Sequence, residues 1–287
     1  MIKALITGVN GFVGPYLVEE LVSNGYTVFG CSLEKESTVN KLAGYFSCDI
    51  TNPLEVEKVI NSIKPDVVFH LAGFSSVSKS FENPELCFKI NVEGTKNIID
   101  SFNKLKVFPK LILISSAEVY GQPVKNPVNE SAKLNSLSPY ANSKIEQEKV
   151  ALTYKNSIIV RAFNHTGVNQ PLPFVIPSFR KQVAEAKEGG EVLVGNIDIT
   201  KDFSNVLDVV KAYKIIFEKG KVGEIYNVGS GKGYLLRSVL EKMIKESGKS
   251  ISIAIDPKKY RPADITELVC DNSKIKKLGI KIKGYFD

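Results

Sequence analysis

The sequence predicts an α/β protein with a doubly wound parallel sheet and a smaller, mixed α/β lobe at the C-terminal end. Three observations support this. Apolar strand candidates alternate with helical patterns over the first 160 residues. Several of these strands are continuously apolar, as in Val67–Phe69 and Leu111–Ile114, which is typical of strands covered on both faces. A glycine-rich turn directly follows the first strand.

Composition narrows the class of protein. Of 287 residues, 43% are hydrophobic and 24% charged, so a globular fold is expected rather than disorder. The net charge of +7 is spread among 31 acidic residues, which favours a solvated lysine surface over a nucleic-acid partner. No long apolar run indicates a membrane span or secretory signal, so we expect a cytoplasmic protein. Cys31, Cys48, Cys87 and Cys270 lie far apart, which argues against a metal site or disulfides.

The first part of the chain, residues 1–162, is predicted to form a dinucleotide-binding domain. The expected strands are Ile2–Thr7, Thr27–Cys31, Tyr45–Asp49, Asp66–Ala72, Leu111–Ser115 and Ser157–Ala162. The expected helices are Val13–Ser23, Leu54–Ile63, Pro84–Asn103 and Pro139–Thr153.

Residues 163–287 are predicted to form mainly a substrate-binding lobe, with roughly 197–228 returning to the first domain. Phe163–Phe174 is rich in Pro, Gly and Asn and is interpreted as loop. The expected helices are Val175–Glu188, Leu207–Glu218 and Leu235–Ser247, and the expected strands are Glu191–Val194, Glu224–Val228 and Ile251–Ile255.

The turn after the first strand has the spacing G-x-x-G-x-x-G at Gly8, Gly11 and Gly14. Gly8 allows a sharp turn, Gly11 allows backbone N–H groups to approach a pyrophosphate, and Gly14 allows the helix to pack closely on the sheet. The helix N-terminus adds positive potential at the same place. A Rossmann-type dinucleotide site is therefore predicted, with Asn10, Phe12 and Val13 in the same loop.

The choice of cofactor depends on the end of the second strand. Ser32 stands where an NAD-specific site usually has a carboxylate for the ribose 2′-hydroxyl. Without that carboxylate a 2′-phosphate is repelled less, so NADP(H) is favoured, with NAD(H) possible. Asp49, at the end of the third strand, is a candidate for the adenine amino group or, equally, a cap for the following turn.

The candidate reacting centre combines Ser116, at the end of the fifth strand, with Tyr140 and Lys144 on a helix. Positions i and i+4 share one helix face, so the Lys144 ammonium is expected near the Tyr140 phenol, where it would lower the tyrosine pKa. The Ser116 hydroxyl could bind the same reacting oxygen. The alternative is a surface helix with a chance Tyr–Lys pair, which the preceding glycine loop disfavours.

These motifs resemble the extended short-chain dehydrogenases/reductases of the nucleotide-sugar branch. The resemblance covers nearly the whole chain through segments that include Thr7–Gly14, His70–Gly73, Asn91–Thr95, Ser115–Gly121, Tyr140–Lys144 and Arg161–His165. Within the branch, Phe163–Gly167, Val194–Asp198, Asp202–Phe203, Tyr226–Gly231 and Arg261–Asp264 are most similar to GDP-6-deoxy-4-keto-mannose reductases.

The resemblance implies a role for each matching residue. Tyr140 would give a proton to the C4 oxygen of the sugar, with Lys144 as its partner and ribose ligand and Ser116 as second hydroxyl. The cofactor would also contact Asp49, Ile50, Leu71, Ala72 and Gly73. The substrate would contact Ser75, Ser76, Asn164, Phe174, Val175, Asn196, Lys201, Arg237, Arg261 and Asp264, with both arginines on the diphosphate and Asp264 on a ribose hydroxyl.

The implied activity is NAD(P)H-dependent reduction of a nucleotide-linked 4-keto-6-deoxyhexose, with GDP-4-keto-6-deoxy-mannose giving GDP-rhamnose or its C4 epimer. A GDP-mannose 4,6-dehydratase is the alternative, because Glu118 stands where such an enzyme has its additional acid/base. A 4-epimerase and a non-catalytic NAD(P)-sensing protein rank lower. This sequence departs from the family at two positions, where Lys201 and Leu33 stand in place of expected arginines. The resemblance also implies a homodimer through Pro84–Asn103 and Pro139–Thr153.

Overall fold

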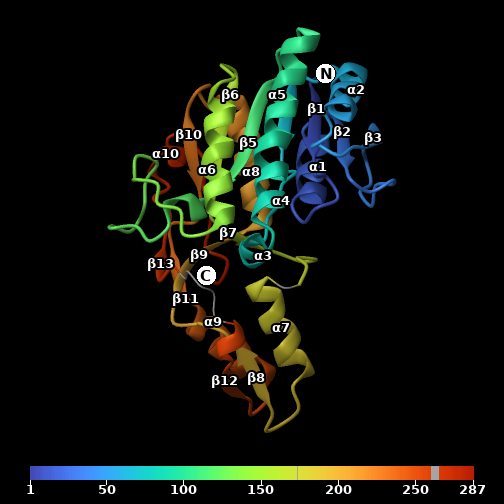
Figure 1. Ribbon diagram of the computed structural model, residues 1–287. Helices are drawn as coiled ribbons and strands as arrows, with labels where there is room; N and C mark the ends of the chain where they lie inside the picture. Colours follow the sequence, from blue (N-terminus) through green and yellow to red (C-terminus); the bar gives the residue numbers. More distant parts are fainter. Residues whose placement is uncertain (173, 260–264) are drawn as a thin grey trace.

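The computed structural model describes residues 1–172, 174–259 and 265–287. Its main sheet has seven parallel strands in the order β10-β6-β5-β4-β1-β2-β3 (Figure 1). The strands are β1 (Lys3–Thr7), β2 (Thr27–Ser32), β3 (Gly44–Ser47), β4 (Val67–His70), β5 (Lys110–Ser116), β6 (Ser157–Ala162) and β10 (Ile225–Val228). The order reverses direction at β1, and in open sheets of this kind ligands bind at the carboxyl ends of the strands at such a point.

Helices cover both faces of this sheet, which confirms the predicted doubly wound fold. Side chains alternate along a strand, so Ala4 and Ile6 pack on one face and Leu5 on the other. The first face holds α1 (Gly14–Ser23) and α8 (Val206–Lys219). The second holds α2 (Pro53–Ile63), α5 (Gly94–Leu105) and α6 (Pro139–Leu152).

The helix expected over Pro84–Asn103 is interrupted. It consists of α4 (Pro84–Phe88), a π-helical turn η1 (Lys89–Glu93) and α5. The wider turn is accompanied by a side-chain bond, in which the Thr95 hydroxyl donates to the Asn91 carbonyl oxygen at 2.7 Å. A short helix, α3 (Val77–Glu82), precedes α4, and a 3-10 turn, η2 (Ala117–Tyr120), follows β5.

The C-terminal lobe has its own apolar core. Helices α7 (Val175–Glu185) and α9 (Leu236–Ser247) pack around the parallel pair β8 (Glu191–Val194) and β12 (Ser252–Ile255). A second small sheet contains β7 (Asn164–Thr166), β9 (Thr200–Asn205), β11 (Gly233–Leu235) and β13 (Glu267–Leu268). The interpretation of Phe163–Phe174 as loop throughout was therefore wrong at β7, a short polar strand with no apolar pattern.

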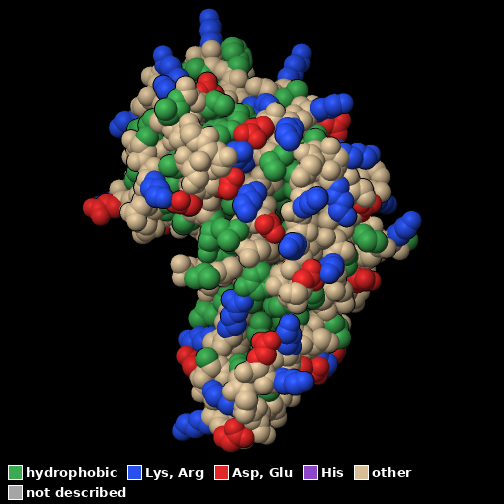
Figure 2. Space-filling view, turned by 180° about the vertical axis from the view of Figure 1, so that it is seen from behind, with side chains coloured by type: hydrophobic (Ala, Val, Ile, Leu, Met, Phe, Trp, Pro, Cys, Tyr) green, Lys and Arg blue, Asp and Glu red, His purple; other side chains and the backbone are tan. Residues whose placement is uncertain are grey.

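The two parts of the chain interleave. After β9 the chain returns to the main sheet through α8 and β10. Past a 3-10 turn, η3 (Pro257–Lys259), the short helix α10 (Ser273–Lys276) lies against β10, and Ile275, Ile280 and Ile282 join the first core. No helix in the described parts of the chain is long and apolar enough to cross a membrane. Figure 2 shows basic and acidic side chains interspersed over one face rather than gathered by sign.

Candidate active site

The turn between β1 and α1 has the geometry that a pyrophosphate requires. Gly8 has φ +69°, and a Cβ there would lie 2.7 Å from the Cα of Ala72. A Cβ on Gly14 would collide with the Val9 carbonyl oxygen at 1.9 Å, whereas at Gly11 the nearest atom is the Gly8 oxygen at 3.1 Å. A Cβ is therefore excluded at Gly8 and Gly14 and crowded at Gly11, whose exposed backbone near the N-terminus of α1 suits a dinucleotide diphosphate.

Asn10 connects this turn to the chain beyond β2. Its N–H donates to the Ser32 hydroxyl at 3.1 Å, and its Nδ2 donates to Oε2 of Glu34, also at 3.1 Å. The Asn10 Oδ1 atom accepts from the Ser37 hydroxyl and the Thr38 N–H. A carboxylate thus lies two residues beyond Ser32, at a position that sequence reasoning did not use.

Asp49 and Ile50 follow β3. The Asp49 Oδ1 atom accepts from both the N–H and the hydroxyl of Thr51, at 2.8 and 2.9 Å, so the side chain caps the following turn. The Ile50 side chain packs against Gly94, and its carbonyl accepts from Asn97 at 3.0 Å. The turn-cap interpretation of Asp49 describes its observed contacts, and any contact with adenine stays a prediction.

The reacting-centre residues come together at the carboxyl edge of the sheet. Tyr140 is 8% exposed and hydrogen-bonds the Ser116 side chain. The Lys144 Nζ atom lies 6.0 Å from the centre of the Tyr140 ring. After β4, the backbone of Leu71 and Ala72 lies against Gly8, and a Cβ on Gly73 would lie 3.6 Å from the Lys144 Nζ.

The electrostatics of this pair differ from expectation. Burial raises the pKa of Tyr140 above its usual value, and only the hydrogen bond with Ser116 acts in the opposite direction. Burial also lowers the pKa of Lys144 to about 8, opposed by Cys87 and Glu148. The expected lowering of the tyrosine pKa by lysine was wrong for this structure, because desolvation outweighs any attraction across that distance.

Glu118 lies beside this centre and contacts the second lobe. Its N–H donates to the Ser116 hydroxyl at 3.2 Å, and its carboxylate raises the pKa of Tyr140. The Lys201 Nζ atom on β9 lies 3.6 Å from Oε1 of Glu118. Lys201 thus contacts a carboxylate from the reacting centre.

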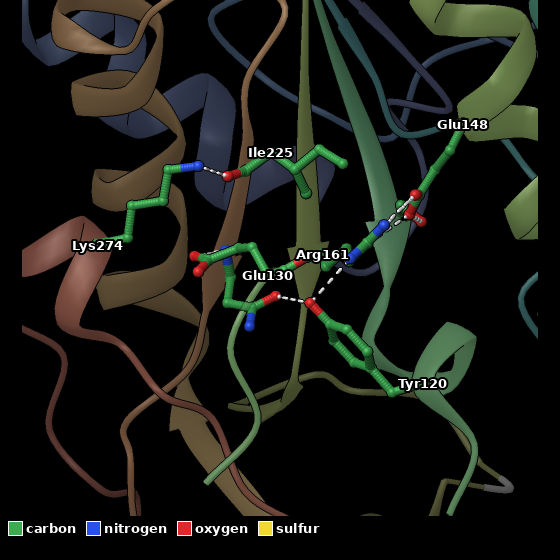
Figure 3. Close-up of polar contacts among 8 residues, drawn as sticks. Tyr120, Glu130, Glu148, Arg161, Ile225 and Lys274 are labelled. Carbon is green, nitrogen blue, oxygen red and sulfur yellow. Dashed lines mark hydrogen bonds and ion pairs between the residues drawn. The ribbon is translucent and has the colours of Figure 1, made fainter. Parts of the chain in front are cut away.

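A buried ion pair fixes the helix that carries Tyr140 and Lys144. The Arg161 guanidinium on β6 binds both carboxylate oxygens of Glu148 on α6, with an Nη2–Oε2 distance of 2.7 Å (Figure 3). Both side chains are 4% exposed. Arg161 also donates to the Tyr120 hydroxyl at 3.0 Å, which donates to Asn227 Oδ1 at 2.7 Å. These bonds tie α6 to β6 and β10.

The other proposed substrate residues are more dispersed. Arg237 on α9 forms a two-pronged ion pair with Asp198, with N–O distances of 2.7 and 2.8 Å. Asn196 Oδ1 accepts the N–H of Asp198 at 3.1 Å, and Ser76 caps α3. Exposed or half-exposed positions hold Ser75, Asn164, Phe174 and Val175. Arg261 and Asp264 lie outside the described residues.

Ser80 and Ser143 support the centre but were given no role from the sequence, whereas Asn91 was expected to fasten a helix to the sheet. The Tyr140 N–H donates to the Ser80 hydroxyl at 3.1 Å. Asn91 donates to the Ser143 hydroxyl at 2.8 Å and accepts the N–H of Phe74 at 2.8 Å, so it fastens the segment after β4 to α6. Ser143 lies within the Tyr140–Lys144 motif, and its small side chain at a buried helix position was a usable signal.

Comparisons with known proteins agree with this arrangement. The family model for GDP-mannose 4,6 dehydratase matches residues 5–287. A GDP-6-deoxy-D-mannose reductase of Pseudomonas aeruginosa is 30% identical over 272 residues, covering 91% of this chain and 86% of that protein.

Two solved structures are similar over almost their whole length. RMD from Pseudomonas aeruginosa complexed with NADPH is 28% identical, with a TM-score of 0.85, and the match covers 98% of this chain and 93% of that one. A UDP-glucose 4-epimerase from Thermus thermophilus in complex with NAD is 27% identical, with a TM-score of 0.85 and coverage of 98% and 94%.

The fold and these matches define an NAD(P)-dependent enzyme of the nucleotide-sugar branch of the short-chain dehydrogenases/reductases. The chain belongs to the GDP-mannose 4,6-dehydratase family.

Proposed function

We propose that this protein reduces the C4 ketone of GDP-4-keto-6-deoxy-mannose, giving GDP-rhamnose or its C4 epimer. The observation that carries the choice of reaction is the contact between Glu118 and Lys201. A dehydratase needs an additional acid/base that approaches the sugar, whereas here the glutamate in that position faces an ammonium from β9. The reductase of Pseudomonas aeruginosa, at 30% identity, supports the same choice.

The residues of the centre suit a reduction. The turn at Gly8, Gly11 and Gly14 would hold NAD(P)H, which would supply a hydride for the C4 carbon of the sugar. Burial raises the pKa of Tyr140, so the phenol carries its proton at neutral pH and can give it to the C4 oxygen as that oxygen becomes an alkoxide. Ser116 donates to the same oxygen, and solvent returns a proton to the tyrosinate. A Cβ on Gly73 would lie 2.8 Å from the Asn91 Oδ1 atom, so the absence of a side chain lets this backbone approach Asn91 beside Lys144.

We propose that both NADP(H) and NAD(H) are accepted, and that Glu34 decides between them. The absence of a carboxylate at Ser32 favours a 2′-phosphate. The Glu34 carboxylate binds Asn10 in the cofactor turn, so its negative charge would repel a 2′-phosphate there.

We also propose a homodimer through α4, α5 and α6, where Leu86 and Leu152 are 47% and 46% exposed. Light scattering would measure the mass of the dimer.

One mass-spectrometric experiment distinguishes the candidate reactions. The enzyme is incubated with GDP-4-keto-6-deoxy-mannose and NADPH or NADH, and separately with GDP-mannose and no reductant. A reductase adds two hydrogen atoms to the keto sugar and leaves GDP-mannose unchanged. Loss of water from GDP-mannose would indicate the dehydratase instead, and a sugar of unchanged mass whose proton NMR spectrum shows inversion at C4 would indicate an epimerase.

A further inference from the structure

A chain of buried hydrogen bonds leads away from Lys144 and takes no part in the roles given above. The Lys144 Nζ atom donates to Gln147 Oε1 at 2.8 Å, and Gln147 Nε2 donates to the Thr95 hydroxyl at 2.7 Å. That hydroxyl lies 2.9 Å from His70 Nε2, and His70 Nδ1 lies 2.7 Å from the Thr7 hydroxyl. All five side chains are buried, and Gln147 and Thr95 are fully inaccessible.

Counting protons fixes the direction of these bonds. A threonine hydroxyl has one proton, and Thr95 gives it to the Asn91 carbonyl at 2.7 Å. Thr95 must then accept from Gln147 and from His70, so His70 carries its proton on Nε2. His70 Nδ1 accepts from Thr7, whose oxygen accepts the Ala72 N–H at 3.2 Å. Burial and the Lys144 charge lower the pKa of His70 to about 3, which keeps the ring neutral.

The same count fixes the Gln147 carboxamide. If the group were flipped, its NH2 would face the donor Lys144 and its oxygen would face Thr95, which has no proton to give it. Gln147 is therefore held with its oxygen toward the ammonium. The chain of bonds continues to Thr7 at the end of β1, immediately before Gly8 of the cofactor turn.

We propose that Gln147 is a positioning residue for Lys144: its fixed carboxamide oxygen orients the ammonium and keeps it protonated in a buried site. The consequence for catalysis rests on the proposed function, because it assumes that Lys144 acts beside Tyr140. The position is three residues beyond Lys144, on the same face of α6, so the two side chains are neighbours.

The surroundings of Lys144 explain why this oxygen matters. The ammonium donates to two neutral acceptors, Gln147 Oε1 and the Ile114 carbonyl at 3.1 Å. The titratable groups near it are Tyr140 and Glu148 on α6, Cys87 on α4 and His70 on β4. Cys87 and Glu148 raise its pKa and burial lowers it, leaving it at about 8. Loss of one acceptor would weaken the stabilisation of the charged ammonium, so burial would lower the Lys144 pKa further.

The test measures the Lys144 pKa directly, by NMR titration of protein labelled with 13C at the lysine ε-carbon. The Lys144→Met variant assigns the signal. In Gln147→Met the side chain keeps its size but loses the acceptor, so the pKa should fall by one unit or more. In Gln147→Glu a carboxylate faces the ammonium, so the pKa should rise. If Gln147 had a purely structural role, both variants would be less stable to heat, but the Lys144 pKa would not move in opposite directions in the two.

The matched control is Gln182→Met on α7 of the second lobe, where the glutamine binds the Leu193 N–H and the Ser178 hydroxyl. It should leave the Lys144 signal unchanged. Unchanged pKa values in both Gln147 variants, or shifts in the same direction, would overturn the proposal. If Gln147→Met does not fold, the shift in Gln147→Glu decides alone.

Activity provides the second readout. The basic limb of the pH profile of kcat/KM should move to lower pH in Gln147→Met and to higher pH in Gln147→Glu, and a fall of one unit from a pKa of about 8 gives about a threefold loss for Gln147→Met at pH 7.5. If the pKa moves as expected but the wild-type enzyme reduces no 4-keto sugar, the proposed function fails and the role of Gln147 stands. If the sugar is reduced and the pKa does not move, the role of Gln147 fails alone.

Discussion

The Nζ atom of Lys201 lies 3.6 Å from Oε1 of Glu118, so a strand of the second lobe contacts the segment that follows β5. The contact is largely buried, with side-chain exposures of 10% and 20%. It joins the part of the chain proposed to hold the nucleotide sugar to the part that holds Ser116 and Tyr140. The glutamate therefore has a partner other than substrate, which is why we assign it no proton transfer.

Glu118→Gln tests this assignment. In a reductase the variant should lose less than about tenfold in kcat, because removal of a true general acid or base costs about 10²–10⁴-fold. Steady-state kinetics with GDP-4-keto-6-deoxy-mannose measures the change. Lys201→Met is the companion variant, and it should raise KM more than it lowers kcat. A loss of several orders of magnitude in Glu118→Gln would show that the glutamate takes part in proton transfer during the reduction.

Tyr140→Phe removes the proposed proton donor and keeps the ring. We expect kcat to fall by about 10²–10⁴-fold, while the dissociation constant for NADPH or NADH, followed by fluorescence, stays nearly the same. Tyr154→Phe is the matched control: it also removes a buried tyrosine hydroxyl, one that donates to the Pro109 carbonyl at 2.7 Å. Turnover by Tyr140→Phe close to that of the control would exclude Tyr140 as the acid.

Glu34→Gln should shift cofactor preference toward NADP(H). The carboxylate lies 3.1 Å from Asn10 Nδ2, and a 2′-phosphate beside it would meet a like charge. Roughly 1–2 kcal/mol of repulsion corresponds to a change of about tenfold in the ratio of kcat/KM for NADPH over NADH. Glu36→Gln is the control, because Asn10 binds the backbone carbonyl of Glu36 and not its carboxylate. Equal ratios in both variants would show that Glu34 does not face the ribose.

His70 should make the fold sensitive to acid. Its pKa is about 3 in the folded protein and about 6.5 when unfolded, so between these values the unfolded chain binds more protons. Stability is therefore lost as the pH falls from 6.5 toward 3. Urea unfolding at pH 6.5 and 4.5 should show wild type losing about 2 kcal/mol more than His70→Gln, which cannot be protonated. Equal losses in the two proteins would mean that His70 is accessible to protons.

The sequence predicted correctly those features that depend on residues close together in the chain. Continuous apolar strands, helical periodicity and the glycine turn predicted the main sheet and its order of elements, because each signal lies within a few neighbouring residues. The short strands β7 and β13 carry no such signal, since each contributes only two or three residues to a small sheet. The contacts of Glu118 with Lys201 and of Gln147 with Thr95 join residues 83 and 52 positions apart, so the folded chain was needed to find them.

The Tyr140–Lys144 motif shows the same limit within a single helix. Spacing placed both side chains on one face of α6, and both lie near the sheet edge. It could not predict how far burial would act on each group. Desolvation raises the pKa of Tyr140 and lowers that of Lys144, and it depends on the surrounding strands rather than on the motif.

Arg161→Met should be the most destabilising of the substitutions considered. It leaves the Glu148 carboxylate buried at 4% exposure without its guanidinium, and removing one partner of such a pair costs about 3–5 kcal/mol. The Tyr120 hydroxyl would lose a donor at the same time. Urea unfolding measures the loss. Because Glu148 anchors the helix that carries Tyr140, kcat should also fall before the protein unfolds.

Two further variants separate the ion pair from a general effect on α6. Lys149→Met breaks the exposed pair with Glu146 on the same helix and should cost less than about 1 kcal/mol, because solvent screens both charges. Adding Glu148→Gln to Arg161→Met should recover part of the lost stability, since the uncompensated charge is removed. If the double variant is no more stable than Arg161→Met, the loss comes from packing at Arg161 and not from the charge left on Glu148.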